Sequence, residues 1–328
     1  MARTLVTGAT GFIGKHLVKA LVKEGREVRC LVRKKSNTKD MVKLGVELCY
    51  GDLLSKQSLE GAIDGVDFIH HIAGEVYSKR VTDYYNTNVV GTKNLIEVCY
   101  NKNIKKFMYL SSIAAVGQNA NRDNLLNEKS PCNPMTPYGK SKFIAEKMVL
   151  ESFYTNRIPV VIIRPPIVYG PGQPYILTRF FRMIEKGDFK IIGDGNNLKS
   201  FCYIDNLIQG ILLAENSEKS VGKIYFISDN QIYTPKMIAQ AIANEEGVAI
   251  SQKHLPFLVS SFCGLLFLLL VKVFRVYSIS LYSIKTMTVN FGCDISRSKE
   301  ELGYNPSIDL EEGVKRTLHW CREEGLLN

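Results

Sequence analysis

The chain of 328 residues is long enough for one large domain with a smaller satellite. Its hydrophobic content of 45% and charged content of 23% are ordinary for a globular protein. The formal net charge of +10 suits an anionic cofactor or an anionic membrane surface. The sequence has no arginine-rich tract and no RNA-binding signature, so we expect no nucleic-acid partner.

The eight cysteines are scattered, without a Cys-x-x-Cys pair or a Cys/His group of zinc spacing. We therefore expect no metal site and a reducing, cytoplasmic environment. A strand is predicted directly at the N-terminus, so we expect no signal peptide.

Short apolar runs alternate with helical patterns over the first half of the chain. Helices are predicted over residues 12–24, 83–100 and 137–153, the first of them ended by Gly25. This alternation indicates an α/β fold of the Rossmann type, with a doubly wound parallel sheet covered on both faces. The predicted strands are 3–8, 27–33, 46–52, 66–74, 105–112 and, with its exit loop, 158–172.

The pattern loosens in the second half, which we expect to form a smaller α+β lobe over the carboxyl ends of the strands. Thr234 and Pro235 are typical of a helix start. We predict a dinucleotide-binding domain at 1–170, to which segments of the later chain return, and a substrate lobe at 171–328. The predicted elements of this half are strands at 190–193 and 223–228 and helices at 178–186, 204–214 and 234–246.

Three glycines, Gly8, Gly11 and Gly14, separate the first strand from the first helix. Gly8 allows a turn off the strand, Gly11 lets the backbone approach a pyrophosphate, and Gly14 lets the helix pack on the sheet. The first-turn N–H groups and the helix dipole then face the phosphates. The alternative is a purely structural corner, but the place between a strand and a helix favours a dinucleotide-binding turn.

The end of the second strand decides which dinucleotide is preferred. A carboxylate that would bond the ribose of NAD is expected here, and the sequence has Arg33, Lys34 and Lys35 instead. These cations favour a 2′-phosphate, so we predict NADP in preference to NAD. Asp52, after the third strand, can accept a hydrogen bond from the adenine amino group.

Tyr138 and Lys142 are four residues apart on a predicted helix and so share one face. An ammonium beside a phenol favours the phenolate, which makes the tyrosine a usable general acid/base near neutral pH. Ser112, at the end of the fifth strand, can hold a substrate oxygen by a hydrogen bond. Such a Tyr/Lys pair is common by chance, but together with the glycine turn and the Ser-Ser strand end it predicts an active site.

These motifs in this order resemble the extended short-chain dehydrogenase/reductase superfamily, in its NAD(P)-dependent epimerase/dehydratase group. The matching stretches run nearly end to end along the chain. They are "TGATGFIG", "GDL", "HIAG", "NVVGT", "YLSSIAAVG", "PYGKSK", "RPPIVYGPG", "FCYIDN" and "EELGYNPSIDLEEGV".

The resemblance implies that Ser112, five residues before Gly117, is the catalytic serine, with Tyr138 and Lys142 as its partners. It also implies that Ala73, Asn88, Lys142 and Pro165 line the nicotinamide side, and that the protein forms a homodimer through a helix bundle. The residues that we expect to bind the dinucleotide are Gly8, Thr10, Gly11, Phe12, Ile13, Gly14, Arg33, Lys34, Asp52, Leu53, Ala73, Gly74, Asn88, Tyr138, Lys142, Pro165 and Ile167.

Departures from the family's pattern restrict the range of expected substrates. Ile113 and Ala114 stand where sugar-nucleotide dehydratases carry Asp-Glu, and these side chains cannot move protons. Lys199 stands where sugar epimerases usually have an arginine that grips a diphosphate. The C-terminal region looks more like the 3β-hydroxysteroid dehydrogenase and dihydroflavonol reductase branches. This likeness implies a small apolar substrate of sterol, isoprenoid or flavonoid type.

The segment 255–271, "LPFLVSSFCGLLFLLLV", is uncharged for 17 residues and is followed by Lys272 and Arg275. It is short for a membrane span and contains a proline, a glycine and two serines. We expect it to wall an apolar substrate pocket or to contact a membrane face peripherally, at the inner side of the membrane. The alternative is an ordinary core helix.

Three functions remain open. The first is a dehydrogenase or reductase that interconverts a secondary alcohol and a ketone by hydride transfer, with Tyr138 as general acid/base. The second is a nucleotide-sugar epimerase that retains its NAD(P). The third is a non-catalytic dinucleotide sensor or scaffold, against which the intact Ser112, Tyr138 and Lys142 argue.

Overall fold

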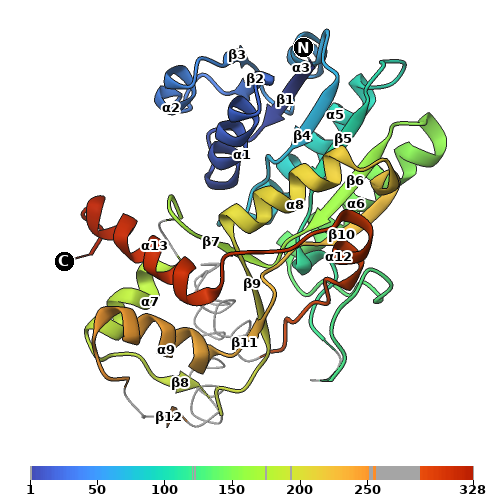
Figure 1. Ribbon diagram of the computed structural model, residues 1–328. Coiled ribbons are helices and arrows are strands. Elements are labelled where there is room, and N and C mark those ends of the chain that lie inside the picture. The colour runs from blue at the N-terminus through green and yellow to red at the C-terminus, as the bar shows by residue number, and fades with distance from the viewer. Residues whose placement is uncertain are drawn as a thin grey trace.

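Seven parallel strands form the central sheet of the molecule (Figure 1). The computed structural model describes residues 2–119, 121, 123–173, 176–192, 194–250, 254–255 and 289–327. The strands are β1 (Arg3–Thr7), β2 (Glu27–Val32), β3 (Glu47–Tyr50), β4 (Phe68–His71), β5 (Lys106–Leu110), β6 (Val160–Arg164) and β10 (Lys223–Phe226). Their order is β10-β6-β5-β4-β1-β2-β3, so the predicted doubly wound α/β fold is confirmed.

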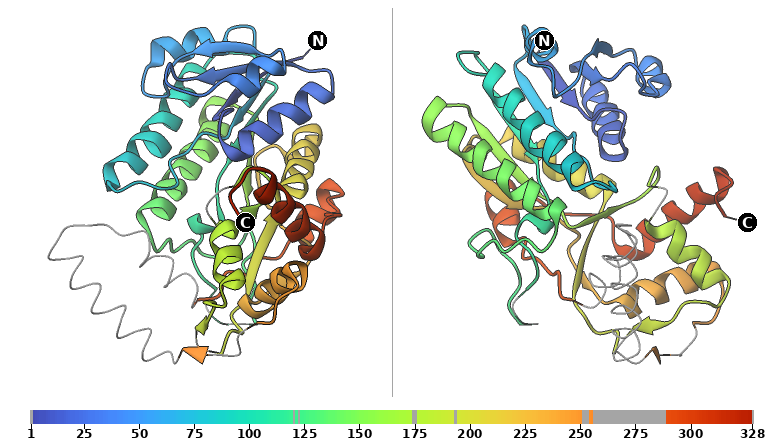
Figure 2. Two further views of the ribbon diagram at one scale, coloured as in Figure 1. Left: turned by 90° about the vertical axis from the view of Figure 1, so that its left-hand side faces the viewer. Right: turned by 180° about the vertical axis from the view of Figure 1, so that it is seen from behind.

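Helices cover both faces of this sheet (Figure 2). On one face lie α1 (Phe12–Lys23) and α8 (Ile204–Asn216), and on the other lie α3 (Lys56–Ile63), α5 (Gly91–Val98) and α6 (Pro137–Asn156). Each face has its own buried apolar cluster, so the strands read as almost continuous apolar runs.

Neighbouring residues of β4 face different layers because side chains alternate along a strand. His70 contacts Glu215 of α8, whereas His71 contacts Thr92 of α5. We call the edge at which all seven strands end the carboxyl edge, and the opposite one the amino edge.

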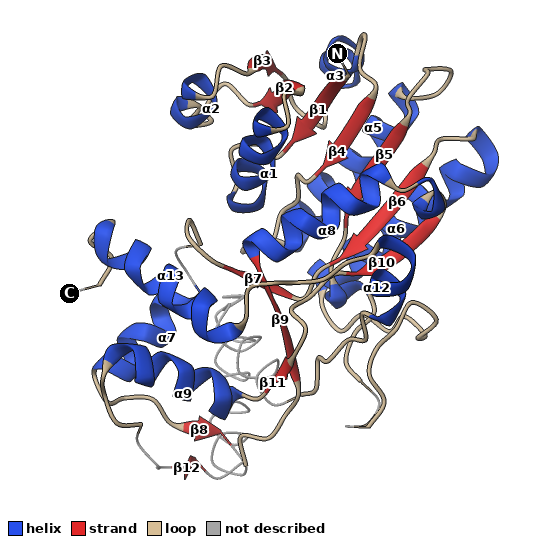
Figure 3. Ribbon diagram, viewed as in Figure 1, coloured by secondary structure: helices blue, strands red, loops and turns tan. Residues whose placement is uncertain are grey.

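The later chain forms a smaller lobe beyond the carboxyl edge (Figure 3). Thr234 caps the helix α9 (Pro235–Glu246) by accepting a hydrogen bond from the N–H of Met237, as its Thr-Pro start predicts. The lobe contains the three-stranded sheet of β7 (Ile167–Tyr169), β9 (Lys199–Tyr203) and β11 (Ile232–Tyr233), the strand pair β8 (Ile191–Ile192) and β12 (His254–Leu255), and the packed helices α7 (Ile176–Glu185), α9 (Pro235–Glu246) and α13 (Leu310–Glu323).

The helix predicted over 83–100 is three pieces, α4 (Val81–Tyr84), a π-helical turn η1 (Tyr85–Val90) and α5. A π turn holds an extra residue, which apolar periodicity over a few turns does not reveal. The sequence also did not predict four further helices, because their apolar patterns are brief or interrupted. These are α2 (Lys39–Lys43), α3, α12 (Ser296–Leu302) and α13.

The predicted domain boundary at residue 170 and the predicted role of the segment 255–271 stay predictions. The strand β10 belongs to the later chain yet pairs in parallel with β6, but the division at residue 170 is not tested by this pairing. Within the described residues, no helix is long and apolar enough to cross a membrane. The segment 255–271 lies outside the described residues, apart from the backbone of Leu255.

Candidate active site

The glycine turn joins β1 to α1 at the carboxyl edge. Gly8 has a φ of 74°, and a Cβ there would lie 2.6 Å from the backbone nitrogen of Ala73. A Cβ on Gly14 would lie 2.1 Å from the carbonyl oxygen of Gly8, so the third glycine is required by the turn itself. Gly11 is the exposed N-cap of α1 and has no side chain to cap the first-turn N–H groups. These groups are left for an anion, so the turn fits the pyrophosphate of a dinucleotide.

The loop after β7 lies against the start of α1. His16 Nε2 lies 2.8 Å from the carbonyl oxygen of Pro171 and must donate, because a carbonyl only accepts. A Cβ on Gly172 would lie 3.5 Å from the ring of Phe12. The predicted dinucleotide residue Phe12 therefore turns its ring toward this loop, which places the loop next to the glycine turn.

Arg33 and Lys34 directly follow β2, and Asp52 follows the neighbouring strand β3. All three side chains are exposed. One carboxylate oxygen of Asp52 accepts a hydrogen bond from the N–H of Leu54 at 2.9 Å, which fixes the side chain at the end of its strand. Two cations and one carboxylate thus lie at one corner of the carboxyl edge, where an adenosine half would need them.

Asn88 lies in the π turn η1 and is fully buried. Its Nδ2 donates to the carbonyl of Glu75 at 3.0 Å and to the hydroxyl of Ser141 at 2.9 Å, and its Oδ1 accepts from the N–H of Glu75 at 2.7 Å. A Cβ on Gly74 would lie 3.3 Å from Asn88 Oδ1 and 3.6 Å from Lys142 Nζ. Asn88 therefore holds the loop after β4 against α6, with the bare backbone of Gly74 beside the lysine.

A chain of hydrogen bonds connects the glycine turn with this π turn through His71. Thr92 donates its hydroxyl hydrogen to the carbonyl of Asn88 at 2.6 Å, so His71 Nε2, at 2.8 Å from that hydroxyl, must be the donor. Thr7 then donates to His71 Nδ1 at 2.7 Å, and it accepts from the N–H of Ala73 at 3.3 Å. Burial, with a contribution from the nearby Lys142 charge, lowers the pKa of His71 to about 3, which agrees with a neutral ring.

The two serines that follow β5 lie in different environments. Ser111 is buried, and its hydroxyl is hydrogen-bonded to Glu146. Ser112 is half-buried in extended backbone and accepts a hydrogen bond from the N–H of Ala114 at 3.2 Å, which begins the 3₁₀ turn η2 (Ile113–Ala115). Of the two, Ser112 is the serine with a hydroxyl that a substrate could reach.

The first turn of α6 packs directly on η2. A Cβ on Gly139 would lie 2.3 Å from the carbonyl oxygen of Ala114, so this close approach depends on glycine. Thr136 caps the helix by accepting a hydrogen bond from the N–H of Gly139 at 2.9 Å. The packing brings Tyr138, which is half-buried, beside the turn that begins at Ser112.

Lys142 lies one turn further along α6 and is 3% exposed. Its Nζ donates to the carbonyl of Leu110 at 2.6 Å and lies 4.4 Å from the centroid of the Tyr109 ring. Burial lowers the pKa of Lys142 to about 7, although the charge of Glu146 opposes this shift. The sequence predicted an ammonium here, but it could not reveal the burial that lets the group lose its proton near neutral pH.

A buried ion pair below the site was missed from the sequence. Arg164 donates from Nε to Glu146 Oε1 at 3.0 Å and from Nη2 to Oε2 at 2.6 Å, and both side chains are almost fully buried. Arg164 lies within the apolar run "VVIIRPP", and a charge in a buried strand needs a buried partner. The charge within this apolar run thus predicts a buried acidic partner for Arg164. Glu146, four residues after Lys142, is that partner.

The other residues predicted to bind the dinucleotide lie in several elements at the carboxyl edge. Pro165 follows β6, and its carbonyl accepts a hydrogen bond from the N–H of Ile113 at 2.9 Å. Leu53 is buried against Gly91, whereas Ile167 in β7 is 37% exposed. Thr10 and Ile13 are half-buried at the start of α1. Their predicted contacts with a dinucleotide stay predictions.

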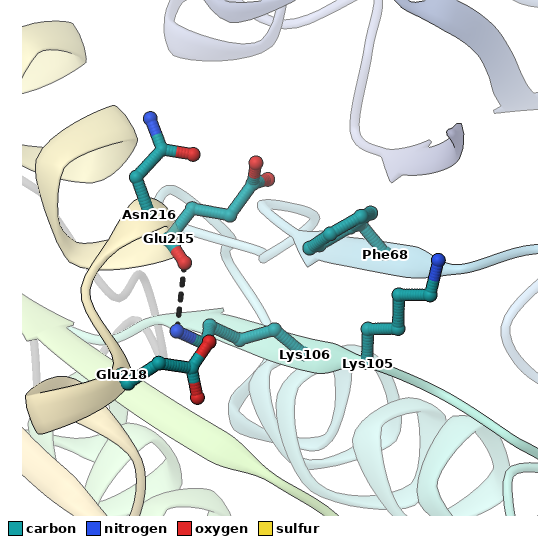
Figure 4. Close-up of a pocket in the computed structure, with 6 residues that line it drawn as sticks. All are labelled: Phe68, Lys105, Lys106, Glu215, Asn216 and Glu218. Carbon is teal, nitrogen blue, oxygen red and sulfur yellow. Dashed lines mark hydrogen bonds between the residues drawn. The ribbon is translucent and has the colours of Figure 1, made fainter. Parts of the chain in front are cut away.

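A pocket of about 390 Å³ lies at the amino edge, where β4 and β5 begin (Figure 4). Lys106 is buried there, and its Nζ donates to the carbonyls of Glu215 and Ser217, both at 2.7 Å, and to the hydroxyl of Ser220 at 3.3 Å. Its three donors are therefore all used. None of the residues predicted to bind substrate or dinucleotide lines this pocket.

Comparison with known proteins is consistent with this geometry. The model of the NAD dependent epimerase/dehydratase family matches residues 4–228. An uncharacterised protein of Sinorhizobium fredii is 32% identical over 98% of this chain and 95% of its own length. A 2-alkyl-3-oxoalkanoate reductase of Shewanella oneidensis is 28% identical, over 96% of this chain and 85% of its own.

A UDP-glucose 4-epimerase of Vibrio cholerae is 29% identical over 95% of this chain and 93% of its own. Among solved structures, the UDP-glucuronic acid 4-epimerase from Bacillus cereus in complex with NAD superposes with a TM-score of 0.79. It is 23% identical over 98% of this chain and 99% of its own, which supports the fold.

Proposed function

The chain belongs to the NAD dependent epimerase/dehydratase family, and from that premise we propose that it interconverts a secondary alcohol and a ketone with NAD(P). It is an enzyme of the extended short-chain dehydrogenase/reductase type. The observation that carries the proposal is the convergence at the carboxyl edge. Lys142 lies between the Gly74 backbone and the end of β5, on the helix that brings Tyr138 to the turn of Ser112.

Each of the three side chains has a separate task. Ser112 holds the carbonyl oxygen of the ketone by donating its hydroxyl hydrogen. Tyr138 gives its phenolic proton to that oxygen during reduction and takes it back during oxidation. Lys142, as an ammonium, favours the phenolate and bonds the ribose next to the nicotinamide. When bound, the dinucleotide supplies or accepts the hydride at its nicotinamide ring.

The neighbouring residues support a simple redox reaction. Ile113 and Ala114 follow Ser112 directly and carry no group that can take or give a proton. A dehydration needs a second acid/base pair near the substrate, so the reaction ends with the alcohol or the ketone. The relative that reduces 2-alkyl-3-oxoalkanoates supports an apolar ketone as the substrate class.

The dinucleotide is NADP(H) in preference to NAD(H). Arg33 and Lys34 are exposed at the end of β2, where a 2′-phosphate would lie. A guanidinium can bond a phosphate with two parallel N–H groups, and no carboxylate takes this position to repel it. NAD remains the alternative because the structural neighbour from Bacillus cereus binds it.

A spectrophotometric assay with reduced dinucleotide and a panel of alkyl-substituted 3-oxo acids and cyclic ketones tests the proposal. We expect stoichiometric loss of the reduced nicotinamide with at least one ketone, faster with NADPH than with NADH. The competing function, a sugar-nucleotide epimerase, is favoured by the Vibrio cholerae relative. It would instead convert UDP-sugars with tightly held dinucleotide and no net redox change.

A further inference from the structure

Lys142 is a buried amine that forms no ion pair with a carboxylate in the described part of the chain. The acid whose charge acts on it is Glu146, one turn further along α6, but the two oxygens of Glu146 are bonded by Arg164 and by Ser111. The single hydrogen-bond acceptor of Lys142 among the described residues is the carbonyl of Leu110. A buried ammonium with one neutral acceptor needs a further source of negative potential.

The face of the Tyr109 ring lies where such a source is needed. Lys142 Nζ is 4.4 Å from the ring centroid, the shortest cation–ring distance in the described part of the chain. An aromatic ring carries negative potential on its face, and the attraction grows when water is excluded. Tyr109 is 0% exposed, so the contact lies in a fully desolvated environment.

The ring of Tyr109 is held in place from the neighbouring strand. Tyr109 and His71 are cross-strand partners in β5 and β4, and their rings lie 5.6 Å apart. The hydroxyl of Tyr109, in contrast, is near Thr92 but has no hydrogen-bond partner within bonding geometry in the described residues. The ring, rather than the hydroxyl, is the part of this side chain that contacts Lys142.

The groups around Lys142 come from α6, β5, β4 and the loop after β4, with β6 behind Glu146. On α6 this is Glu146, with Tyr138 one turn before Lys142 and coupled to Tyr109, on β5 the Tyr109 ring, and on β4 His71, whose pKa of about 3 keeps it neutral. The loop after β4 contributes only the backbone of Gly74. Arg164 on β6 acts on Lys142 through Glu146, whose charge it largely compensates.

We propose that Tyr109 is a positioning residue for Lys142, and that the face of its ring holds the ammonium at the end of β5 in place of a carboxylate. A carboxylate at this place would fix the proton on the lysine permanently. The ring stabilises the ammonium more weakly, so the lysine keeps its charge within the working pH range but remains able to titrate. The inference rests on the proposed function, in which Lys142 acts at the dinucleotide and at Tyr138.

The test is a pH titration of Lys142 by heteronuclear NMR of the lysine ε-carbons, in the full-length chain without added dinucleotide. The Lys142→Met variant assigns the resonance. In Tyr109→Leu we expect the titration midpoint to fall by about one pH unit, because the ring face is lost. Tyr109→Phe keeps the ring and should restore the midpoint of the natural protein.

Phe107→Leu is the matched control, since Phe107 is also fully buried in β5, in the same apolar cluster, and also contacts His71. It removes an aromatic ring without touching Lys142 and should leave the midpoint unchanged. An unchanged midpoint in Tyr109→Leu, or an equal shift in Phe107→Leu, would overturn the proposal.

If Tyr109→Leu does not fold, a fluorinated phenylalanine incorporated at position 109 replaces it. This residue keeps the shape of the ring and weakens the negative potential of its face. A midpoint below that of Tyr109→Phe is expected, and an equal midpoint would refute the inference. Because no dinucleotide or substrate is present, this outcome is independent of whether the proposed reaction is correct.

Discussion

Two buried lysines lie at opposite edges of the same sheet, and their surroundings differ. Lys106 at the amino edge donates to two carbonyls and one hydroxyl, so its ammonium is fully bonded. Figure 4 shows the bond to the carbonyl of Glu215. Lys142 at the carboxyl edge donates to one carbonyl and lies over an aromatic ring. Both side chains are 3% exposed, so burial alone does not distinguish them.

The hydrogen bonding of a buried lysine indicates whether its role is structural or chemical. The fully bonded Lys106 fastens the end of α8 to β5, next to Glu215, which is itself paired with Arg26 and His70. Burial alone would raise the pKa of Glu215, but His70 and Arg26 lower it below its usual value. Burial lowers the pKa of Lys106 as well, but its ammonium is fully hydrogen-bonded and Glu215 is ion-paired, which is typical of a structural network. The under-bonded Lys142 has a pKa of about 7, which is typical of a group that takes part in chemistry.

The largest effect should come from the tyrosine that Lys142 serves. Tyr138→Phe removes the proton that reduction requires and should lower kcat by about 10² to 10⁴-fold. The dissociation constant of the dinucleotide and the thermal midpoint should stay close to their original values, because the ring remains. Steady-state kinetics and fluorescence titration of NADPH measure the two quantities. Near-original turnover in this variant would remove the proposed mechanism.

Replacing each lysine by methionine should separate the two edges. Lys106→Met leaves buried carbonyls without a donor and should lower the free energy of unfolding by about 2–3 kcal/mol. Its kcat at a temperature where it stays folded should be unchanged. Lys142→Met should not lower the free energy of unfolding, since it removes a poorly bonded buried amine.

The activity of Lys142→Met should nevertheless fall by about 10²-fold, and its dinucleotide affinity by about tenfold. Urea unfolding and kinetics on both variants check this crossed pattern. If Lys106→Met lost activity as strongly as Lys142→Met while remaining folded, the distinction between the two edges would fail.

The lowered pKa of Lys142 also predicts a pH dependence of stability. Its folded pKa is about 7, whereas an unfolded lysine titrates near pH 10.4, so the unfolded chain binds more protons between these values. The free energy of unfolding therefore rises with pH through that window because of Lys142, by about 1.4 kcal/mol per pH unit at most.

We expect the free energy of unfolding to increase by about 1–2 kcal/mol more in the original protein than in Lys142→Met when the pH is raised from about 7.5 to about 9. Urea unfolding of both proteins at the two pH values measures this difference. If the free energy of unfolding rose equally with pH in both proteins, Lys142 would not be a buried amine with a lowered pKa.

The smallest effect concerns the outer corner of the carboxyl edge. Arg33 is exposed, so Arg33→Asp should shift the preference from NADPH toward NADH by about tenfold through direct contact with the 2′-phosphate. Lys102→Asp, an exposed charge change after α5, is the control. Dissociation constants of both dinucleotides decide the matter, and equal affinities in the original protein would count against the charge argument.

Much of this site could be predicted because its signals are local. The glycine turn, the Ser112 strand end and the Tyr138–Lys142 spacing each lie within a few residues, and parallel strands bring their carboxyl ends to one edge. The fold class followed from the strand and helix periodicities.

The features that escaped prediction are long-range or depend on burial. The ion pair of Arg164 with Glu146 joins a strand to a helix, and the contact of Tyr109 with Lys142 joins residues 33 positions apart. The π turn that carries Asn88 adds a residue without changing the apolar pattern visibly. The pKa of Lys142 depends on how deeply α6 packs on β5, which no local pattern encodes.

In the proposed reaction, a hydride moves at the carboxyl edge between a dinucleotide and a carbon of the substrate, with net turnover. The most direct measurement uses reduced nicotinamide dinucleotide with deuterium at both hydrogen positions of C4, an alkyl-substituted 3-oxo acid as the ketone, and mass spectrometry of the product. We expect one deuterium on the new carbinol carbon of each alcohol formed, and no labelled product with Tyr138→Phe. An unlabelled product, or a sugar nucleotide epimerised without any loss of label from the dinucleotide pool, would contradict it.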